Sequence, residues 1–139
     1  MKKLFPLILS LLLFAGCGAS PAREPAEEPP AQEEKAPYRQ VSMDDAMEMM
    51  ETETDYIILD VRRPDEFADK HIPNAINVPN ETIGTEEIPE LPDKDRLILV
   101  YCRSGNRSKQ AAEKLAALGY TNIVEFGGIL DWPGETVSE

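Results

Sequence analysis

The sequence predicts an α/β domain in which a parallel β-sheet is flanked by helices on both faces. Three observations indicate this class. Short apolar runs rich in β-branched residues alternate along the chain with stretches of helical apolar spacing. The run at residues 97–101 is apolar at every position, which is typical of a strand buried on both faces. The 139 residues, 42% of them hydrophobic, have the size expected for one domain.

The first half of the domain is predicted to alternate three strands with two helices. The first helix has an N-cap pattern, Ser42 with Asp45 three residues on, and we interpret its methionines as core residues. The second helix begins at Pro64, since proline suits the first helical turn. The three strands are expected at residues 38–41, 56–59 and 75–78.

The second half is predicted to centre on the strand at residues 97–101. After it, one-sided helical spacing indicates a helix that starts near Arg107 and stops at Gly119. Its apolar face consists of Ala111, Ala112, Leu115 and Leu118. The other expected elements are a short helix around Glu86 within an irregular acidic stretch at 79–95, a strand at 122–126, a turn at Gly127 and Gly128, and a helical turn at 129–132.

The N-terminus has the pattern of an export signal. Lys2 and Lys3 precede an apolar run at residues 4–15 that is too short to span a bilayer. The residues just before Cys17 resemble a bacterial lipobox, in which a peptidase cuts before a cysteine that carries a lipid. We therefore expect a lipoprotein signal peptide at 1–16 and lipidation of Cys17. The alternative is a secretory signal cut elsewhere, which would leave Cys17 as an ordinary thiol.

Residues 17–37 are predicted to be a lipidated cysteine followed by a tether. Residues 18–37 contain five prolines, five alanines and five glutamates, and no apolar side chain larger than alanine that could build a core. Such a segment is extended and self-repelling. The alternative interpretation is a partner-binding tail. The folded domain is then expected to occupy residues 38–139, held outside the cytoplasm at a bacterial membrane by the lipid on Cys17.

The charge excludes one large class of partners. The formal net charge is −12, and removal of the signal with Lys2 and Lys3 leaves 12 basic and 26 acidic residues, a net charge of −14. Nucleic acid is therefore not expected as a partner. An anionic substrate would have to be attracted by local cations against the field of the whole protein.

A single thiol follows the central predicted strand. Cys102 stands at the carboxyl end of that strand, before a short loop and the N-terminus of the next predicted helix. The free N–H groups and dipole of a helix N-terminus favour an anion, and Arg103 and Arg107 add two positive charges. We therefore expect Cys102 to be a reactive thiolate. The alternative is a structural cysteine buried in the core.

The length of this loop predicts which anion it fits. Four residues separate Cys102 from Arg107, one fewer than in tyrosine-phosphatase loops. The run Cys-Arg-Ser-Gly-Asn-Arg-Ser at residues 102–108 resembles the active-site loop of single-domain rhodaneses, the thiosulfate-type sulfurtransferases. A second resemblance lies in Asp-Val-Arg at 60–62, Glu-Phe at 66–67 and His-Ile-Pro-Asn-Ala at 71–75, although Lys70 and Asn74 replace the family's usual glycines.

The resemblance implies a rhodanese-like domain that transfers sulfur through a persulfide on Cys102. It implies no cofactor and no metal. It assigns substrate binding to the loop, whose residues are Arg103, Ser104, Gly105, Asn106, Arg107 and Ser108. Asp60 and Arg62 are supporting residues: Asp60 is expected to accept backbone or arginine hydrogen bonds, and Arg62 to pair with Glu66 or Asp65. His71 is expected to anchor a loop through a hydrogen bond rather than to form a Cys-His dyad.

The expected partners are a small anionic sulfur donor and an unidentified thiol or other sulfur acceptor. The membrane is a partner only through the lipid anchor, and the domain is expected to be a monomer. Two other classes of function stay open at this point. One is a cysteine-dependent phosphatase or arsenate reductase, which would need a longer loop and a general acid. The other is a non-catalytic module that carries sulfur or binds a partner.

Overall fold

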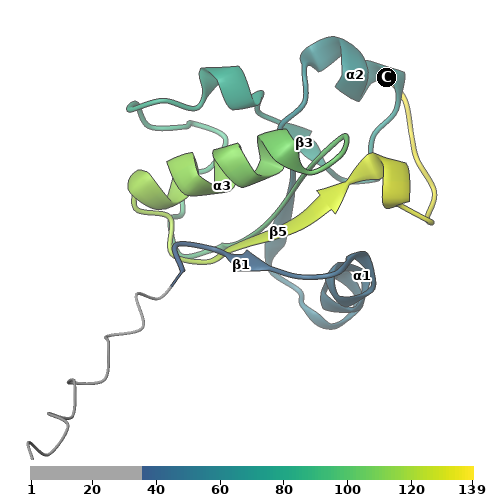
Figure 1. The fold of residues 1–139 in the computed structure, drawn as a ribbon, viewed down its shortest axis with the longest axis horizontal. Helices are drawn as coiled ribbons and strands as arrows, with labels where there is room; N and C mark the ends of the chain where they lie inside the picture. Colours follow the sequence, from purple (N-terminus) through teal and green to yellow (C-terminus); the bar gives the residue numbers. More distant parts are fainter. Residues whose placement is uncertain (1–35) are drawn as a thin grey trace, which may run out of the picture. The chain divides into compact units, whose positions relative to one another are not determined.

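The computed structural model describes residues 36–139 (Figure 1). The predicted signal peptide, Cys17 and the tether up to residue 35 lie outside the described residues. In the described part, no helix is long and apolar enough to cross a membrane.

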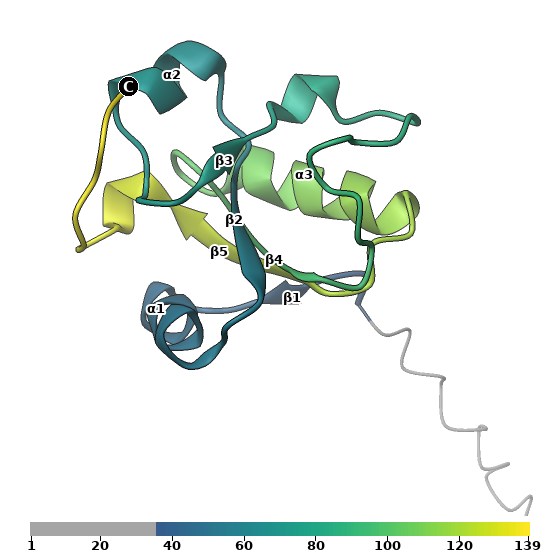
Figure 2. The same ribbon diagram turned by 180° about the vertical axis from the view of Figure 1, so that it is seen from behind.

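The predicted α/β class is confirmed. Five strands form one parallel sheet in the order β1-β5-β4-β2-β3, with β4 in the middle (Figure 2). The strands are β1 (Arg39–Gln40), β2 (Tyr56–Asp60), β3 (Ile76–Asn77), β4 (Leu97–Cys102) and β5 (Ile123–Gly128). The helices are α1 (Met43–Thr52), α2 (Pro64–Asp69) and α3 (Asn106–Ala117), with 3₁₀ turns η1 (Asn80–Thr82) and η2 (Ile129–Asp131).

Helices cover both faces of the sheet. On one face, α3 buries Ala111, Ala112 and Leu115 together with Ile98, Val100 and Ile123 of the strands. On the other face, α1 buries Ala46, and Phe67 of α2 joins the same cluster. Figures 1 and 2 show α3 and α1 on opposite sides of the sheet. All six residues of β4 are buried, as its unbroken apolar run predicts.

The predicted helix ends are largely confirmed. Ser42 caps α1, because its hydroxyl accepts the N–H of Asp45 at 3.1 Å. Pro64 is the first residue of α2. At the end of α3, Gly119 has a φ of +97°, a conformation that few other residues adopt readily. The methionines of α1, expected in the core, enter it only in part: Met43, Met49 and Met50 are partly buried against the core, and Ala46 is the one fully buried residue of this helix.

The helix predicted around Glu86 is wrong. The stretch contains only η1 at its start, and the rest is irregular. Its backbone is fixed by packing rather than by local propensity, because Ile83, Ile88 and Leu91 insert into the core beneath α3. The other end of the acidic stretch is held by Tyr120, whose hydroxyl donates to the Leu91 carbonyl at 2.6 Å.

The turn predicted at Gly127 and Gly128 is also wrong, because both residues belong to β5. Val100 of β4 is opposite Glu125, whereas Cys102 is opposite Gly128, so β5 contains one extra residue over this interval. Such a bulge bends a strand locally, and Gly127 accommodates it with a φ of +98°. The strands predicted at 38–41 and 75–78 are present but only two residues long.

Candidate active site

Two predicted functional residues end neighbouring strands at one edge of the sheet. Asp60 is the last residue of β2 and Cys102 the last of β4, and Asp60 is opposite Tyr101 in the register. Cys102 is a free thiol that is only 1% exposed. The carboxyl edge of a parallel sheet is the usual place for a ligand.

The loop after β4 is built around the Cys102 sulfur. Gly105, with a φ of +109°, is the N-cap of α3, and its N–H donates to the sulfur at 3.0 Å. The thiol lies 3.4 Å from the hydroxyl of Ser108, in the first turn of α3. The predicted placement of Cys102 at a helix N-terminus is therefore confirmed. Of the other loop residues, Ser104 and Asn106 are exposed.

The end of β5 supports this loop from below. A Cβ atom on Gly128 would lie only 2.0 Å from the carbonyl oxygen of Arg103, so the loop rests on a backbone that has no room for a side chain. The next turn adds a hydrogen bond, since Leu130 donates its N–H to the same carbonyl at 3.2 Å. Gly128 is thus a residue of the site that the sequence interpretation placed in a turn.

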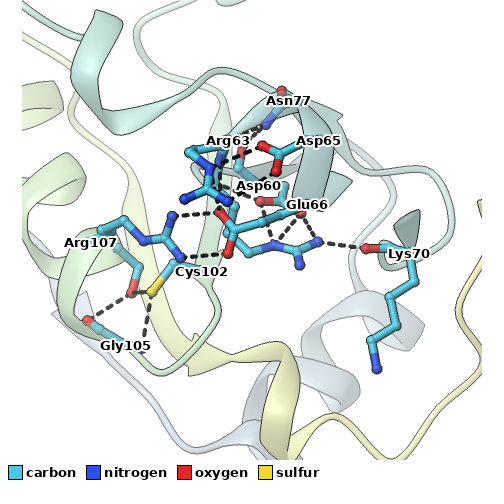
Figure 3. Close-up of polar contacts among 11 residues, drawn as sticks. Asp60, Arg63, Asp65, Glu66, Lys70, Asn77, Cys102, Gly105 and Arg107 are labelled. Carbon is cyan, nitrogen blue, oxygen red and sulfur yellow. Dashed lines mark hydrogen bonds and ion pairs between the residues drawn. The ribbon is translucent and has the colours of Figure 1, made fainter. Parts of the chain in front are cut away.

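The two loop arginines differ. Arg107 forms a two-pronged ion pair with Glu66 of α2, at 2.7 and 3.0 Å (Figure 3). This pair lowers the pKa of Glu66 to about 2 and raises that of Arg107 above its ordinary value. Arg103 is exposed and forms no ion pair within residues 36–139. Arg103 is therefore the more available cation.

The predicted pairing of Arg62 with Glu66 or Asp65 is wrong. Arg62 instead binds Asp60 at 2.7 Å, and both side chains are buried, 3% and 0% exposed. An ionised carboxylate this deep is stabilised by a cation beside it, and Glu66 is already held by Arg107. The exposed Arg63 takes the expected role, contacting Asp65 at 3.0 Å.

Asp60 accepts the hydrogen bonds predicted for it, although they come from its own segment. It binds the backbone N–H and the guanidinium of Arg62, which also donates to the Lys70 carbonyl at 2.6 Å (Figure 3). Burial acts to lower the pKa of Arg62, but the hydrogen bond and the charge of Asp60 outweigh it, so that this pKa is raised above its ordinary value. Beside it, burial and the Asp60 charge raise the pKa of Tyr101. Asp60 therefore orders residues 60–70 rather than the cysteine loop.

His71 is a structural anchor, as predicted. Its Nδ1 lies 2.8 Å from the Phe67 carbonyl oxygen, and its ring stacks on the Phe67 ring at 3.7 Å between centroids. Its backbone pairs with Val137 near the C-terminus. These contacts explain the position of His71 without any contact with Cys102.

Glu125 is the residue of the site that sequence reasoning missed. It lies on β5 and is 3% exposed. The Ser108 hydroxyl donates to its carboxylate at 2.6 Å, and the Gly127 N–H donates to the same oxygen at 2.9 Å. The available signal was a single acidic residue within the apolar run at 123–126.

A pocket of about 310 Å³ lies beside the loop. Arg103, Lys70 and Glu66 line it together with the apolar side chains of Ile129 and Leu130. Lys70, like Arg103, forms no ion pair with any described residue. The pocket therefore offers two available cations next to the segment that carries the thiol.

A buried thiol at the carboxyl end of a central parallel strand, bonded by the N–H of a helix N-cap, defines a class of α/β domains with a cysteine-centred active loop. The comparison with known families agrees with this class. Residues 42–135 match the family described as "Rhodanese-like domain", and the chain belongs to that family.

Two curated relatives are named as sulfurtransferases. The chain is 37% identical over 73 residues to "Thiosulfate sulfurtransferase PspE" of Escherichia coli K12. The aligned region covers 52% of this chain and 70% of the relative. The chain is 40% identical over 79 residues to "Sulfurtransferase" of Allochromatium vinosum, covering 56% and 72%. The family evidence thus supports a sulfurtransferase role.

Solved structures share the fold. A rhodanese-related protein from Thermoplasma volcanium has a TM-score of 0.61 and 33% identity, over 73% of this chain and all of that one. The structure titled "rhodanese with anions from E. coli" has a TM-score of 0.55 and 35% identity, over 60% and 99%.

Proposed function

We propose that this protein is a thiosulfate-type sulfurtransferase that carries sulfur as a persulfide on Cys102. The observation that supports it most strongly is the loop itself, which holds the Cys102 sulfur against the Gly105 N–H at 3.0 Å. The second support is the family, whose relatives are named sulfurtransferases. Because only four residues separate Cys102 from Arg107, the loop suits a single sulfur atom better than a phosphate group.

The proposed reaction has two steps and balances without a cofactor. The Cys102 thiolate attacks the outer sulfur of thiosulfate, a new S–S bond forms, and the old one breaks. Sulfite leaves with the electron pair of the broken bond, and the negative charge of the thiolate moves to the terminal sulfur of the persulfide. A thiol or another thiophilic acceptor then takes that sulfur and restores the thiolate.

The loop residues have distinct proposed roles. Backbone N–H groups from Arg103 to Ser108 hold the terminal sulfur, as the Gly105 N–H holds the resting thiol. Arg103 and Arg107 bind the sulfonate group. Because Glu66 already neutralises much of the Arg107 charge, Arg103 is the first contact of the incoming anion, with Lys70 across the same pocket.

The test is a side-by-side assay with two donors. Purified protein should form thiocyanate from thiosulfate and cyanide, and should turn over a phosphate monoester far more slowly. The control is Cys102→Ser, which should abolish thiocyanate formation. A phosphatase rate above the sulfur-transfer rate would instead favour the phosphatase class.

Inserting one glycine between Gly105 and Asn106 should reduce sulfur transfer, because the loop would no longer fit one sulfur atom.

We also propose that the domain is anchored outside the cytoplasm by a lipid on Cys17. The support is the sequence pattern, a short apolar run followed by small residues and a cysteine. Labelled palmitate should enter the full-length protein when it is expressed in bacteria, and Cys17→Ala should prevent this. Unlabelled wild-type protein found free in the medium would contradict the proposal.

A further inference from the structure

The reactive thiol is linked to a buried carboxylic acid that the proposed reaction does not use. The Cys102 S–H donates to the Ser108 hydroxyl oxygen at 3.4 Å, and that hydroxyl is 2.6 Å from the Glu125 carboxylate. The two residues at the ends of this series of hydrogen bonds are almost fully buried: Cys102 on β4 and Glu125 on β5. A serine hydroxyl has one proton, so it donates to only one acceptor at a time, and besides Cys102 the acceptors around Ser108 are Glu125 at 2.6 Å, the Gly105 carbonyl at 2.9 Å and the Gly127 carbonyl at 3.4 Å.

No cation compensates Glu125 within residues 36–139, since none of the described ion pairs includes it. The residues opposite it on the flanking strands are Gln40 and Val100, which carry no charge. The loop and α3 carry Arg103 and Arg107, and Arg107 interacts electrostatically with Cys102 but is itself paired with Glu66 of α2 and influenced by Glu81. Two negative charges on Cys102 and Glu125 would therefore lie close together in a buried place, which is unfavourable.

We propose that Cys102 and Glu125 share one proton through Ser108, so that Glu125 is a positioning residue that controls the reactivity of the thiol. In one arrangement, the thiol donates to Ser108 and Ser108 donates to the Glu125 carboxylate. Moving each proton one place along converts the thiol into a thiolate and the carboxylate into a carboxylic acid. Ser108 then donates to the thiolate. The net charge of the group is unchanged, so no external base is needed.

This arrangement affects how the site receives its substrate. A site that carries one negative charge repels an anionic donor less than a site that carries two. The formation of the persulfide moves that charge outward to the terminal sulfur, away from Glu125. The inference rests on the proposed function only in taking Cys102 as the reactive group, because it concerns the thiol before any donor binds.

The test measures alkylation of Cys102 by iodoacetamide as a function of pH, which needs no sulfur donor and so can fail independently of the proposed function. Cys17→Ala is the background, leaving one thiol. Glu125→Gln keeps the size of the side chain and removes its charge. It should reach full reactivity at a pH lower by about one to two units, from the repulsion of two close charges in a partly screened site. Glu113→Gln, an exposed glutamate of α3, is the control for net charge and should shift the profile little.

An unchanged profile in Glu125→Gln, a shift to higher pH, or an equal shift in Glu113→Gln would overturn the proposal. A second measurement does not depend on the folding of that variant. In the protein with Glu125 intact, the ¹³C resonance of its carboxyl group should move over the same pH range in which Cys102 becomes reactive. That movement should be absent in Cys102→Ala, and a resonance that behaves identically in both proteins would contradict the shared proton.

Discussion

The ends of β2 and β4 lie side by side at one edge of the sheet but differ in how their charges are used. At the end of β2, the buried Asp60 is bound to Arg62, and the same guanidinium ties down the Lys70 carbonyl. At the end of β4, the buried Cys102 is held by one N–H and one hydroxyl, and the neighbouring Arg103 is exposed and unpaired among the described residues. At the end of β2, the charged groups bind one another, whereas at the end of β4 the charge of Arg103 is available for a ligand.

This difference teaches that a similar pattern, an acidic group followed by an arginine at a strand end, has two uses. A buried ion pair between residues two positions apart fixes the path of the chain. A thiol at a helix N-terminus, next to an exposed arginine, can instead bind a ligand from solvent. The predictions below test this division, from the largest expected effect to the smallest.

The end of β2 should be the more important for stability. Asp60→Ala leaves the buried Arg62 guanidinium without its carboxylate, which should reduce the free energy of unfolding by about 3–5 kcal/mol. The matched control is Asp65→Ala, which breaks the exposed Arg63 pair and should cost less than about 1 kcal/mol. Urea denaturation of both variants measures the two effects. Equal losses would contradict the division.

The end of β4 depends on close backbone packing. Gly128→Ala places a Cβ 2.0 Å from the Arg103 carbonyl oxygen, so the loop has to move. A displacement of about 1 Å in a catalytic group can cost about a hundredfold in rate, and we expect a loss of that order in thiocyanate formation. Gly84→Ala, with no atoms within 4 Å of its new Cβ, should retain the wild-type rate. Full activity in Gly128→Ala would show that the loop position is not critical.

Arg103 should contribute to capture of the substrate but not to stability. Arg103→Ala removes a charge-assisted hydrogen bond worth about 1.5–3 kcal/mol, which corresponds to about a ten- to hundredfold lower rate at low thiosulfate. Its stability should change by less than about 0.5 kcal/mol, since the side chain is exposed. Arg39→Ala, an exposed arginine on β1, is the control. If the two variants lose equal activity, Arg103 has no special role.

The smallest effect is the pH dependence of the Glu66–Arg107 pair. The pair lowers the pKa of Glu66 from 4.5 to about 2, so its stabilisation is fully present above 4.5 and is lost as the pH falls toward 2. Unfolding by urea, measured at both ends of that range, should show this loss in the wild type. Glu66→Gln should lose less stability over the same range, because it has no carboxylate there to protonate. An equal loss in both proteins would be inconsistent with the pair.

Elements with strong local signals could be predicted from the sequence. The apolar run of β4, the Ser42 cap of α1 and the apolar spacing of α3 each depend on residues close together in the sequence. The predicted β4 and α3 are enough to place Cys102 at a helix N-terminus. The helix expected around Glu86 failed because that stretch is fixed by insertion of Ile83, Ile88 and Leu91 into a core formed by distant residues.

The pairings within the site could not be predicted in the same way. Glu66 is 41 residues from Arg107 in the sequence, and only the packing of α2 near α3 decides that it binds Arg107 rather than Arg62. Glu125 is similar, because its contact with Ser108 joins β5 to α3 across 17 residues of sequence. For Arg62 the sequence interpretation chose Asp65 or Glu66, three and four residues away, whereas the structure pairs it with Asp60, two residues away, where both side chains are buried together.

The most direct test of the central claim is the mass of the intact protein after incubation with thiosulfate. In the Cys17→Ala background, where Cys102 is the only thiol, the protein should gain the mass of one sulfur atom. Adding cyanide should remove that mass and release thiocyanate. With Cys102→Ser added, neither change should occur. A protein that forms thiocyanate without ever gaining the sulfur, or a Cys102→Ser variant that still gains it, would contradict a persulfide on Cys102.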